Sequence, residues 1–207
     1  MKYLLAVLLS LSVTANALDH TKDYQANVQA AVRIVTDKGA AGSGLAVGKR
    51  HILTAGHVCE DEDGVRVDFV SPDGKVVAVR GKVEKMEQED PFNKDLGLIV
   101  LNEDAPYWVP LKLGEDKIGD EGYTVGAPKA GLPRNVMVGI FGGGHEHLDL
   151  HTLSGPNAPG ASGSAVFNDK HEIVGVLVSG EPHFLVYFIP VSDLREFLKD
   201  VKFKVKK

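Results

Sequence analysis

Residues 154–166 read SGPNAPGASGSAV, and Ser162 stands in this run among small, turn-forming residues. Gly160 and Gly163 carry no side chains, so the backbone can turn sharply on either side of Ser162. Such a turn presents the serine hydroxyl outward. It also points the N–H groups of Gly160 and Ser162 at one position, where they would stabilise the oxyanion of an acyl-transfer reaction. A plain Gly/Ser/Pro loop between strands has the same composition, so the remaining sequence has to distinguish the two interpretations.

Short strand patterns surround this loop. Apolar and β-branched stretches bounded by turn residues predict a hairpin over 28–47 and strands over 51–58, 65–70, 76–79 and 96–101. Proline and glycine interrupt the pattern over 106–119, which is typical of a linker. A second set of predicted strands then follows, over 123–126, 136–141, 146–150, 165–168, 173–179 and 184–191.

A helix is expected to close the chain. Ser192 is the expected N-cap of this helix. The apolar residues after Ser192 recur on one helical face, namely Leu194, Phe197, Leu198 and Val201. The sequence thus predicts an all-β fold of two six-stranded antiparallel β-barrels with a C-terminal α-helix. Residues 18–110 would form the N-terminal barrel with His57 and Asp95. Residues 111–207 would form the C-terminal barrel with Ser162, the terminal helix and a basic tail.

Residues 1–17 have the pattern of a cleavable secretory signal peptide. Lys2 precedes an apolar run over 3–13, and Ala15 and Ala17 put small residues at the positions that a signal peptidase reads. An uncleaved membrane anchor is the alternative, but the run is shorter than the roughly 20 residues that span a bilayer. We therefore expect an exported protein, periplasmic or secreted, with no stable membrane anchor after cleavage.

The composition is that of a packed globular protein. Of 207 residues, 43% are hydrophobic and 25% are charged, so a sizeable core is available. The formal net charge is −5 and no basic cluster interrupts the body of the chain, which argues against a nucleic-acid partner. We also expect no cofactor. Cys59 is the only cysteine, which excludes an intrachain disulfide and favours a small buried apolar role for its side chain.

Two upstream residues can form a proton-transfer set with Ser162. The motif TAGH over 54–57 places His57 at the end of a predicted strand. Histidine, with an ordinary pKa of about 6.5, can take a proton from serine near neutral pH. Asp95 opens the apolar strand DLGLIVL over 95–101, where a carboxylate is costly to desolvate unless it accepts a hydrogen bond. The second ring nitrogen of His57 would supply that bond and fix the tautomer. A simple turn residue is the alternative for Asp95.

These three motifs resemble those of trypsin-like serine peptidases with the chymotrypsin double-barrel fold. TAGH resembles the family's histidine motif, DLGLIVL its aspartate motif, and GASGSAV, over 160–166, its nucleophile motif. The order His, Asp, Ser is also the family's order. The resemblance implies a serine endopeptidase that hydrolyses protein or peptide substrates through an acyl-enzyme. It implies His57, Asp95 and Ser162 as the catalytic triad, with Gly160 and Ser162 supplying the oxyanion hole.

The likeness is strongest to the disulfide-poor bacterial branch of the family. GSGLAVGKRHILTAGHV over 42–58 is similar to HtrA-type proteases and to glutamyl endopeptidases, and SGSAVFNDKHEIVGV over 162–176 is similar to the latter. No PDZ-like segment follows the predicted barrels, so regulation of the HtrA kind is not expected. Ala161 stands where digestive enzymes of the family carry an aspartate that pairs with a new N-terminus. We therefore expect activity without a zymogen cut.

The family's primary specificity pocket lies between the residues just before the nucleophile and a strand after it. The resemblance places there Pro156, Asn157, Leu177, Ser179, Gly180 and His183. Pro156 stands where an aspartate would select Lys or Arg, and Leu177 stands where glutamyl endopeptidases carry a histidine. We expect a preference for Ala, Val or Leu before the cut, unless His183 swings in and supplies a positive charge.

Two other functions remain open. The alternating residues His145, His147, Asp149 and His151 would share one face of the predicted strand over 146–150. That face could bind zinc or copper, or it could simply meet solvent, and we assign no metal. A catalytically silent double barrel that binds a partner is the alternative to an enzyme, although a binding module does not need all three triad side chains.

Overall fold

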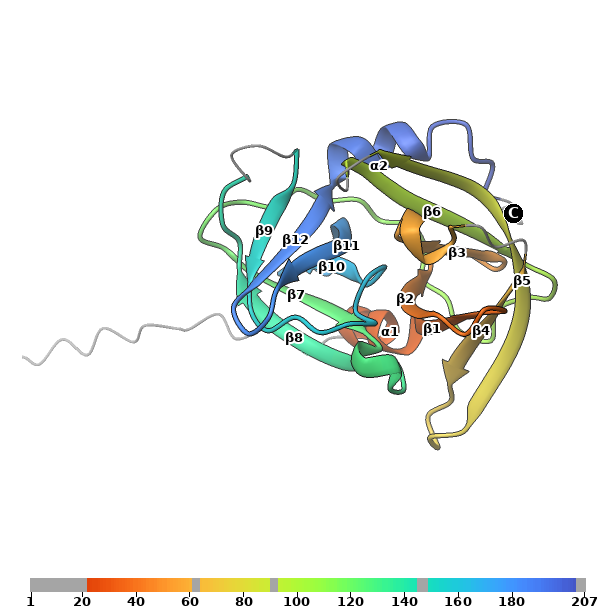
Figure 1. Ribbon diagram of the computed structural model, residues 1–207. Coiled ribbons are helices and arrows are strands. Elements are labelled where there is room, and N and C mark those ends of the chain that lie inside the picture. Colours follow the sequence, from red (N-terminus) through yellow and green to blue (C-terminus); the bar gives the residue numbers. More distant parts are fainter. Residues whose placement is uncertain (1–21, 61–63, 90–92, 145–148, 204–207) are drawn as a thin grey trace, which may run out of the picture.

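Two six-stranded antiparallel sheets stand side by side in the computed structural model, which describes residues 22–60, 64–89, 93–144 and 149–203 (Figure 1). One helix precedes the first sheet and another follows the second. The predicted all-β fold class is confirmed. The first sheet is a closed barrel, whereas the second is a half-barrel.

The first sheet closes on itself because β4 pairs with β1. Its strands are β1 (Ala31–Thr36), β2 (Ala41–Ala46), β3 (His51–Thr54), β4 (Gly64–Val70), β5 (Val76–Glu89) and β6 (Asn93–Leu101), in the order β1-β2-β3-β6-β5-β4. Inward apolar side chains face each other in the strand register, with Ile34 opposite Val67 and Leu53 opposite Leu98. This packing fixes β3 and β6 as neighbours.

The second sheet consists of β7 (Glu121–Gly126), β8 (Asn135–Ile140), β9 (His151–Ser154), β10 (Ala165–Asn168), β11 (Ile173–Glu181) and β12 (Leu185–Pro190), in the order β8-β7-β10-β11-β12-β9. Its two outer strands approach each other at one end, where Phe141 and Leu153 form an antiparallel bridge. A Cβ atom at Gly139 would overlap the Ser154 carbonyl oxygen there. Glycine therefore permits the approach of β8 and β9.

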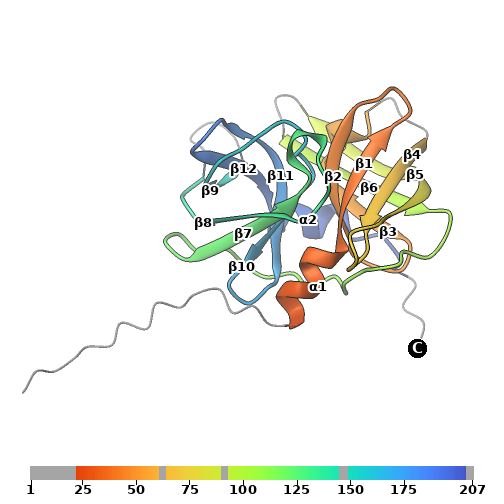
Figure 2. The same cartoon turned by 90° about the horizontal axis from the view of Figure 1, so that it is seen from below.

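The two helices occupy different places on the sheets. Helix α1 (Lys22–Ala30) lies beneath the junction of the two sheets (Figure 2). Helix α2 (Val191–Phe197) buries Val191, Leu194 and Phe197. Among the described residues, neither helix has the length and apolar character needed to cross a membrane.

Two local predictions are wrong. Residues 28–30 belong to α1 and not to a strand. The helix was not predicted because it is mostly polar and buries Asn27, so its sequence lacks the apolar periodicity that indicates a helix. Ser192 lies inside the first turn of α2 and is not its N-cap. The N-cap residue is Pro190, whose side chain makes no capping hydrogen bond. The isolated Pro190 at the end of an apolar strand gave no capping signal.

Other boundaries differ in extent. Strand β5 is far longer than the predicted 76–79, since it continues to Glu89 through a polar stretch. The predicted strand over 146–150 falls largely outside the described residues; Leu150 is not in a strand, and β9 begins at His151. The domain boundary expected between 110 and 111 stays a prediction.

Candidate active site

His57 and Asp95 are held together by the first barrel. His57 lies in the short 3-10 helix Gly56–Val58, which follows β3 after one residue, and Asp95 lies in β6. The pairing of β3 with β6 places Thr54 opposite Gly97 and so brings the two segments side by side. A Cβ atom at Gly56 would lie 2.9 Å from Asp95 Oδ1 and 2.6 Å from the Glu87 carbonyl oxygen. Glycine at position 56 is therefore required for this close approach.

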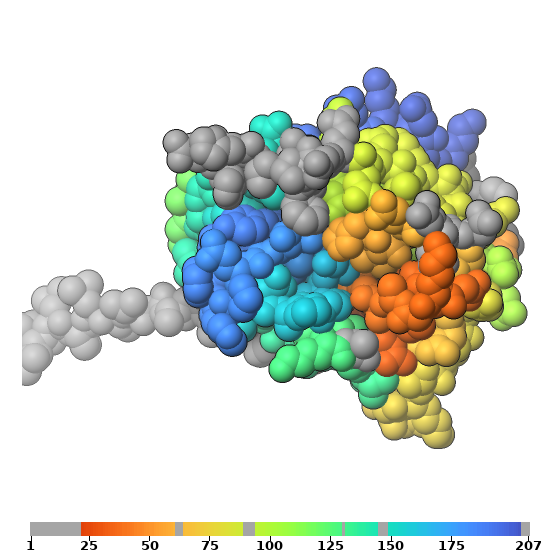
Figure 3. Space-filling model, viewed as in Figure 1, coloured from red at the N-terminus to blue at the C-terminus, as the bar shows by residue number. Residues whose placement is uncertain are grey.

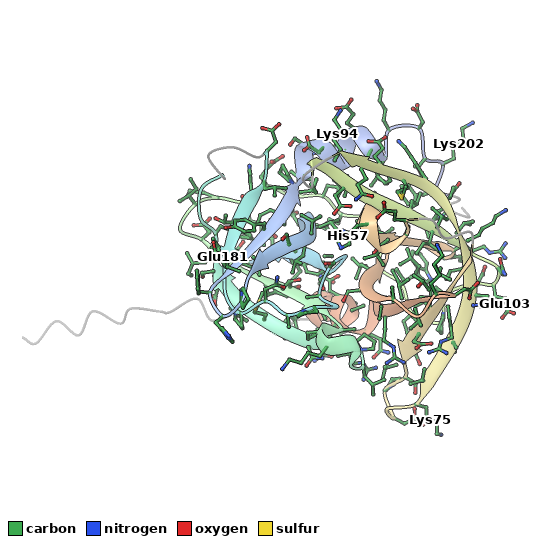
Figure 4. All side chains as sticks on the ribbon, viewed as in Figure 1. His57, Lys75, Lys94, Glu103, Glu181 and Lys202 are labelled. Atoms are coloured by element: carbon green, nitrogen blue, oxygen red, sulfur yellow. The ribbon has the colours of Figure 1, made fainter. Side chains whose placement is uncertain are left out.

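The Asp95 carboxylate is completely buried and binds His57 through both oxygens. The His57 backbone N–H donates to Oδ1 at 2.7 Å, and Nδ1 of the ring lies 2.6 Å from Oδ2. Because a buried carboxylate can only accept, Nδ1 carries the proton and Nε2 is the acceptor nitrogen of the ring. The His57 side chain keeps 27% of its surface exposed and lies where the two sheets face each other (Figure 4).

Ser162 lies in the loop between β9 and β10, and both sheets anchor that loop. Its carbonyl oxygen accepts a hydrogen bond of 2.7 Å from the N–H of Ser43 in β2. On the other side, Gly163 N–H donates to the Leu177 carbonyl of β11 at 2.7 Å. The cyan segment before β10 accordingly borders the orange surface of the first barrel (Figure 3). The loop that contains Ser162 is thus held at the junction of the two sheets.

Gly42 shows how near the serine loop comes to the histidine segment. A Cβ atom on Gly42 would lie 2.6 Å from Val58, the neighbour of His57, and 3.2 Å from the Ser162 carbonyl oxygen. The Ser162 hydroxyl itself donates to the Val178 carbonyl at 3.4 Å, a long and therefore weak hydrogen bond. The hydroxyl can leave this acceptor at little cost.

The two expected oxyanion donors lie on the same loop. Gly160 and Gly163 both have φ of +89°, a conformation that glycine adopts without the steric cost of a side chain. In the described part of the chain, the N–H groups of Gly160 and Ser162 donate to no protein acceptor. They are therefore available to a developing oxyanion.

The residues expected in the specificity pocket occupy different environments. The Asn157 side chain contacts Gly180, since a Cβ atom on Gly180 would lie 2.7 Å from Asn157 Nδ2. The other amide atom, Asn157 Oδ1, is buried without a hydrogen-bond partner among the described residues. Leu177 is buried in the core of the second sheet. His183 lies in the exposed turn closed by the pairing of Glu181 with Leu185. Pro156 is exposed, and Ser179 is half-buried beside Gly180.

The histidine face is described only in part, because His145 and His147 lie outside the described residues. His151 Nδ1 lies 2.8 Å from Oδ2 of Asp116, a residue of the connection between the sheets that sequence reasoning missed. The hydrogen bond to Asp116 raises the pKa of His151, although partial burial opposes it. Within 22–60, 64–89, 93–144 and 149–203, no cluster of three His, Cys, Asp or Glu residues is placed to hold a metal.

Comparisons with known proteins identify the family of the chain. Residues 42–176 match the family model of the trypsin-like peptidase domain. Protease Do-like 2, chloroplastic, from Arabidopsis thaliana is 28% identical over 180 residues, which make up 78% of this chain and 28% of that protein. Do-like 12, mitochondrial, from the same plant is 28% identical over 176 residues, or 76% of this chain and 33% of that protein. The chain thus spans about a third of the length of these relatives.

Solved structures share the fold. The crystal structure of Deg5 superposes with a TM-score of 0.67 at 19% identity, over 84% of this chain and 89% of that chain. The serine endoprotease from Yersinia pestis gives a TM-score of 0.67 at 20% identity, over 87% of this chain and 68% of that chain. Because the family match runs from β2 to β11 and contains His57, Asp95 and Ser162, the chain belongs to the trypsin-like peptidase family.

Proposed function

We propose that this chain is a serine endopeptidase that uses His57, Asp95 and Ser162 as its catalytic triad. The observation that carries the proposal is the buried Asp95 carboxylate, which holds both the backbone and the ring of His57 beside the Ser162 loop. A buried carboxylate oriented in this way keeps the imidazole in the tautomer that can accept the serine proton. Family membership supports peptides or proteins as substrates.

The reaction divides into two steps. The Ser162 hydroxyl leaves the Val178 carbonyl and transfers its proton to His57 Nε2 while Oγ attacks the scissile carbonyl carbon. The carbonyl oxygen becomes an oxyanion that accepts hydrogen bonds from the N–H groups of Gly160 and Ser162. His57 then protonates the leaving amine, which gives the acyl-enzyme. In the second step a water molecule, deprotonated by His57, hydrolyses the ester and restores Ser162.

Hydrolysis of casein or of a peptide library by the purified protein tests this proposal. We expect Ser162→Ala to remove nearly all hydrolysis, by a factor on the order of 10⁶ in turnover. The matched control is Ser192→Ala, which removes another serine hydroxyl from an exposed position of α2. Undiminished hydrolysis by Ser162→Ala would refute the triad. A folded but inactive wild type that binds peptides would favour the catalytically silent binding protein.

The proposed primary pocket takes small or medium apolar side chains. Asn157 sets the depth of this pocket. The Asn157 amide lies against Gly180 of β11, so the side chain reaches from the loop before the nucleophile to the strand after it. No charged side chain stands at positions 156, 157, 177, 179 or 180. A substrate carboxylate or ammonium group would therefore lose its hydration without gaining a partner there.

Export is the remaining part of the proposal, and it rests on the signal pattern over 1–17. The mature chain is expected to begin near Leu18. Expression of the full sequence in a bacterium, followed by intact-mass measurement of the protein from the periplasm and the medium, tests it. Recovery of only the full-length chain from the cytoplasm would argue against export.

A further inference from the structure

Ser43 lies in β2 of the first barrel and is completely buried, yet it binds two loop segments of the second half, the loop that contains Gly160 and Ser162 and the segment that follows β7 at Ala127. Its hydroxyl donates to the Gly160 carbonyl at 2.7 Å and accepts from the Ala127 N–H at 2.8 Å. Its own N–H donates to the Ser162 carbonyl at 2.7 Å. Its carbonyl oxygen accepts from Thr54 Oγ1 at 2.7 Å, which holds Ser43 in the first barrel.

Two peptide groups flank Gly160 and both are held by hydrogen bonds. The Pro159 carbonyl accepts from the Lys129 N–H at 2.6 Å. In a trans peptide the C=O and the next N–H point in opposite directions, so this bond turns the Gly160 N–H away from Lys129. The Gly160 carbonyl is held by the Ser43 hydroxyl. The direction of the Gly160 N–H is therefore fixed from both sides.

The bond from Lys129 also depends on Ser43. Lys129 lies in the 3-10 turn Pro128–Ala130, in which it adopts a φ of +56°, an unfavourable value for a residue with a side chain. The turn begins immediately after Ala127, whose N–H is bound by the Ser43 hydroxyl. One hydroxyl thus holds the Gly160 peptide directly and supports the turn that holds the Pro159 peptide.

We infer that Ser43 is a positioning residue that keeps the oxyanion hole in its donating form; this inference rests on the proposed peptidase function. Without the hydroxyl, the Gly160 carbonyl and the Ala127 N–H lose their shared partner in a buried place, which is costly. Rotation of the peptides next to Gly160 would then let these groups find other partners. That rotation turns the Gly160 N–H away from the substrate oxyanion, while the Ser162 hydroxyl and His57 stay in place.

A graded pair of variants tests the inference. Ser43→Ala removes the hydroxyl, and Ser43→Cys replaces it with a thiol, which is a weaker donor and acceptor. The matched control is Thr152→Val, which also removes a buried hydroxyl, in this case one from the second sheet. The Thr152 hydroxyl donates to the Gly143 carbonyl at 2.9 Å, outside the nucleophile loop. Each variant is assayed well below its melting temperature, and turnover is expressed per folded molecule from circular dichroism.

We expect kcat of Ser43→Ala to fall by about 10- to 100-fold, the range for a misplaced or lost oxyanion donor. KM should stay within about twofold, because substrate binding away from the oxyanion is unchanged. The affinity for a peptide boronate, which mimics the tetrahedral intermediate, should fall in parallel with kcat. Ser43→Cys should give intermediate values, and Thr152→Val should match the wild type.

Wild-type kcat per folded molecule in Ser43→Ala, in an otherwise active protein, would overturn the inference while leaving the proposed function intact. If Ser43→Ala does not fold, Ser43→Cys decides: a kcat equal to that of the wild type overturns the inference, and a lower kcat with unchanged KM supports it. A wild type that neither hydrolyses peptides nor binds the boronate overturns the proposed function and this inference together.

Discussion

At the scale of single residues, the tautomer of His57 is the most consequential feature. Asp95→Asn keeps an oxygen for the His57 backbone N–H but turns the other carboxylate oxygen into an amide donor facing Nδ1. The ring proton must then move to Nε2, and His57 can no longer accept the proton of Ser162. We expect kcat to fall by about 10⁴-fold with the fold retained. Steady-state kinetics and circular dichroism of the variant check this, and a loss of less than tenfold would contradict it.

Asn157 gives a second prediction at the same scale. Asn157→Ala should deepen the pocket and raise kcat/KM for substrates with Leu before the cut by about tenfold or more, relative to substrates with Ala there. It also removes a buried oxygen that has no hydrogen-bond partner, so the melting temperature should not fall. Matched peptides that differ only at this residue measure the change. An unchanged Leu-to-Ala ratio would show that Asn157 does not limit the pocket.

At the scale of elements, α1 is attached to the second sheet by a buried polar cluster. Asn27 Nδ2 donates to the Tyr123 hydroxyl and to the His171 carbonyl, both at 3.1 Å, and the Tyr123 hydroxyl lies 3.1 Å from His171 Nδ1. The Tyr123 ring also stacks on Phe167, and burial raises the pKa of its hydroxyl. Helix α1 leads directly into β1, so this cluster ties the start of the first barrel to the second sheet.

Tyr123→Phe should therefore destabilise the protein and loosen α1. The substitution leaves hydrogen-bonding groups of Asn27 and His171 buried without the tyrosine partner, at a cost of about 1–3 kcal/mol. Urea unfolding measures the loss, and hydrogen exchange should show faster exchange across 22–30. Tyr107→Phe is the control, because it removes a tyrosine hydroxyl from a partly buried ring in the connection between the two sheets, outside this cluster. Equal stability of Tyr123→Phe and wild type would contradict the role of the cluster.

The stability contributed by the hydrogen bond between His151 of β9 and Asp116, in the segment that connects the two sheets, should depend on pH. The hydrogen bond to Asp116 raises the pKa of His151, and Asp193 and Glu115 add to the effect. Because the folded-state pKa is raised, the stabilisation is fully present below the ordinary histidine pKa of about 6.5 and is lost as pH rises through the higher folded value. The melting temperature of wild type minus that of His151→Asn should thus shrink as pH rises from mildly acidic to mildly alkaline. A difference that grows with pH would contradict this.

At the scale of the whole molecule, the candidate site is shared between the sheets: the first supplies His57 and Asp95, and the second supplies the Ser162 loop. The sequence predicted this division because each of these residues sits in a local pattern, a strand end or a glycine turn, that is visible without tertiary structure. Asn27, Ser43 and Asp116 could not be found in this way. Their partners lie far along the chain, and their own surroundings in the sequence are unremarkable polar or glycine-rich stretches.

The same reasoning explains which details of the fold could not be predicted, although the fold class was. The closed barrel and the half-barrel have similar strand patterns, and the difference between them depends on how close β8 and β9 come, which is set by long-range contacts such as that of Gly139 with Ser154. Helix α1 was missed because its stability comes from packing of Asn27 and Tyr24 against Tyr123, and an apolar stripe is not needed.

The most direct test of the central claim is the position of a fluorophosphonate adduct on the wild-type protein. A serine reacts with this reagent only when a neighbouring base activates it and an oxyanion hole receives the phosphonyl oxygen. Intact mass and peptide mapping should show one adduct per chain, on Ser162, and no adduct on Ser162→Ala or on heat-unfolded wild type. A folded wild-type protein that stays unmodified, or one modified at a different serine, would contradict the account.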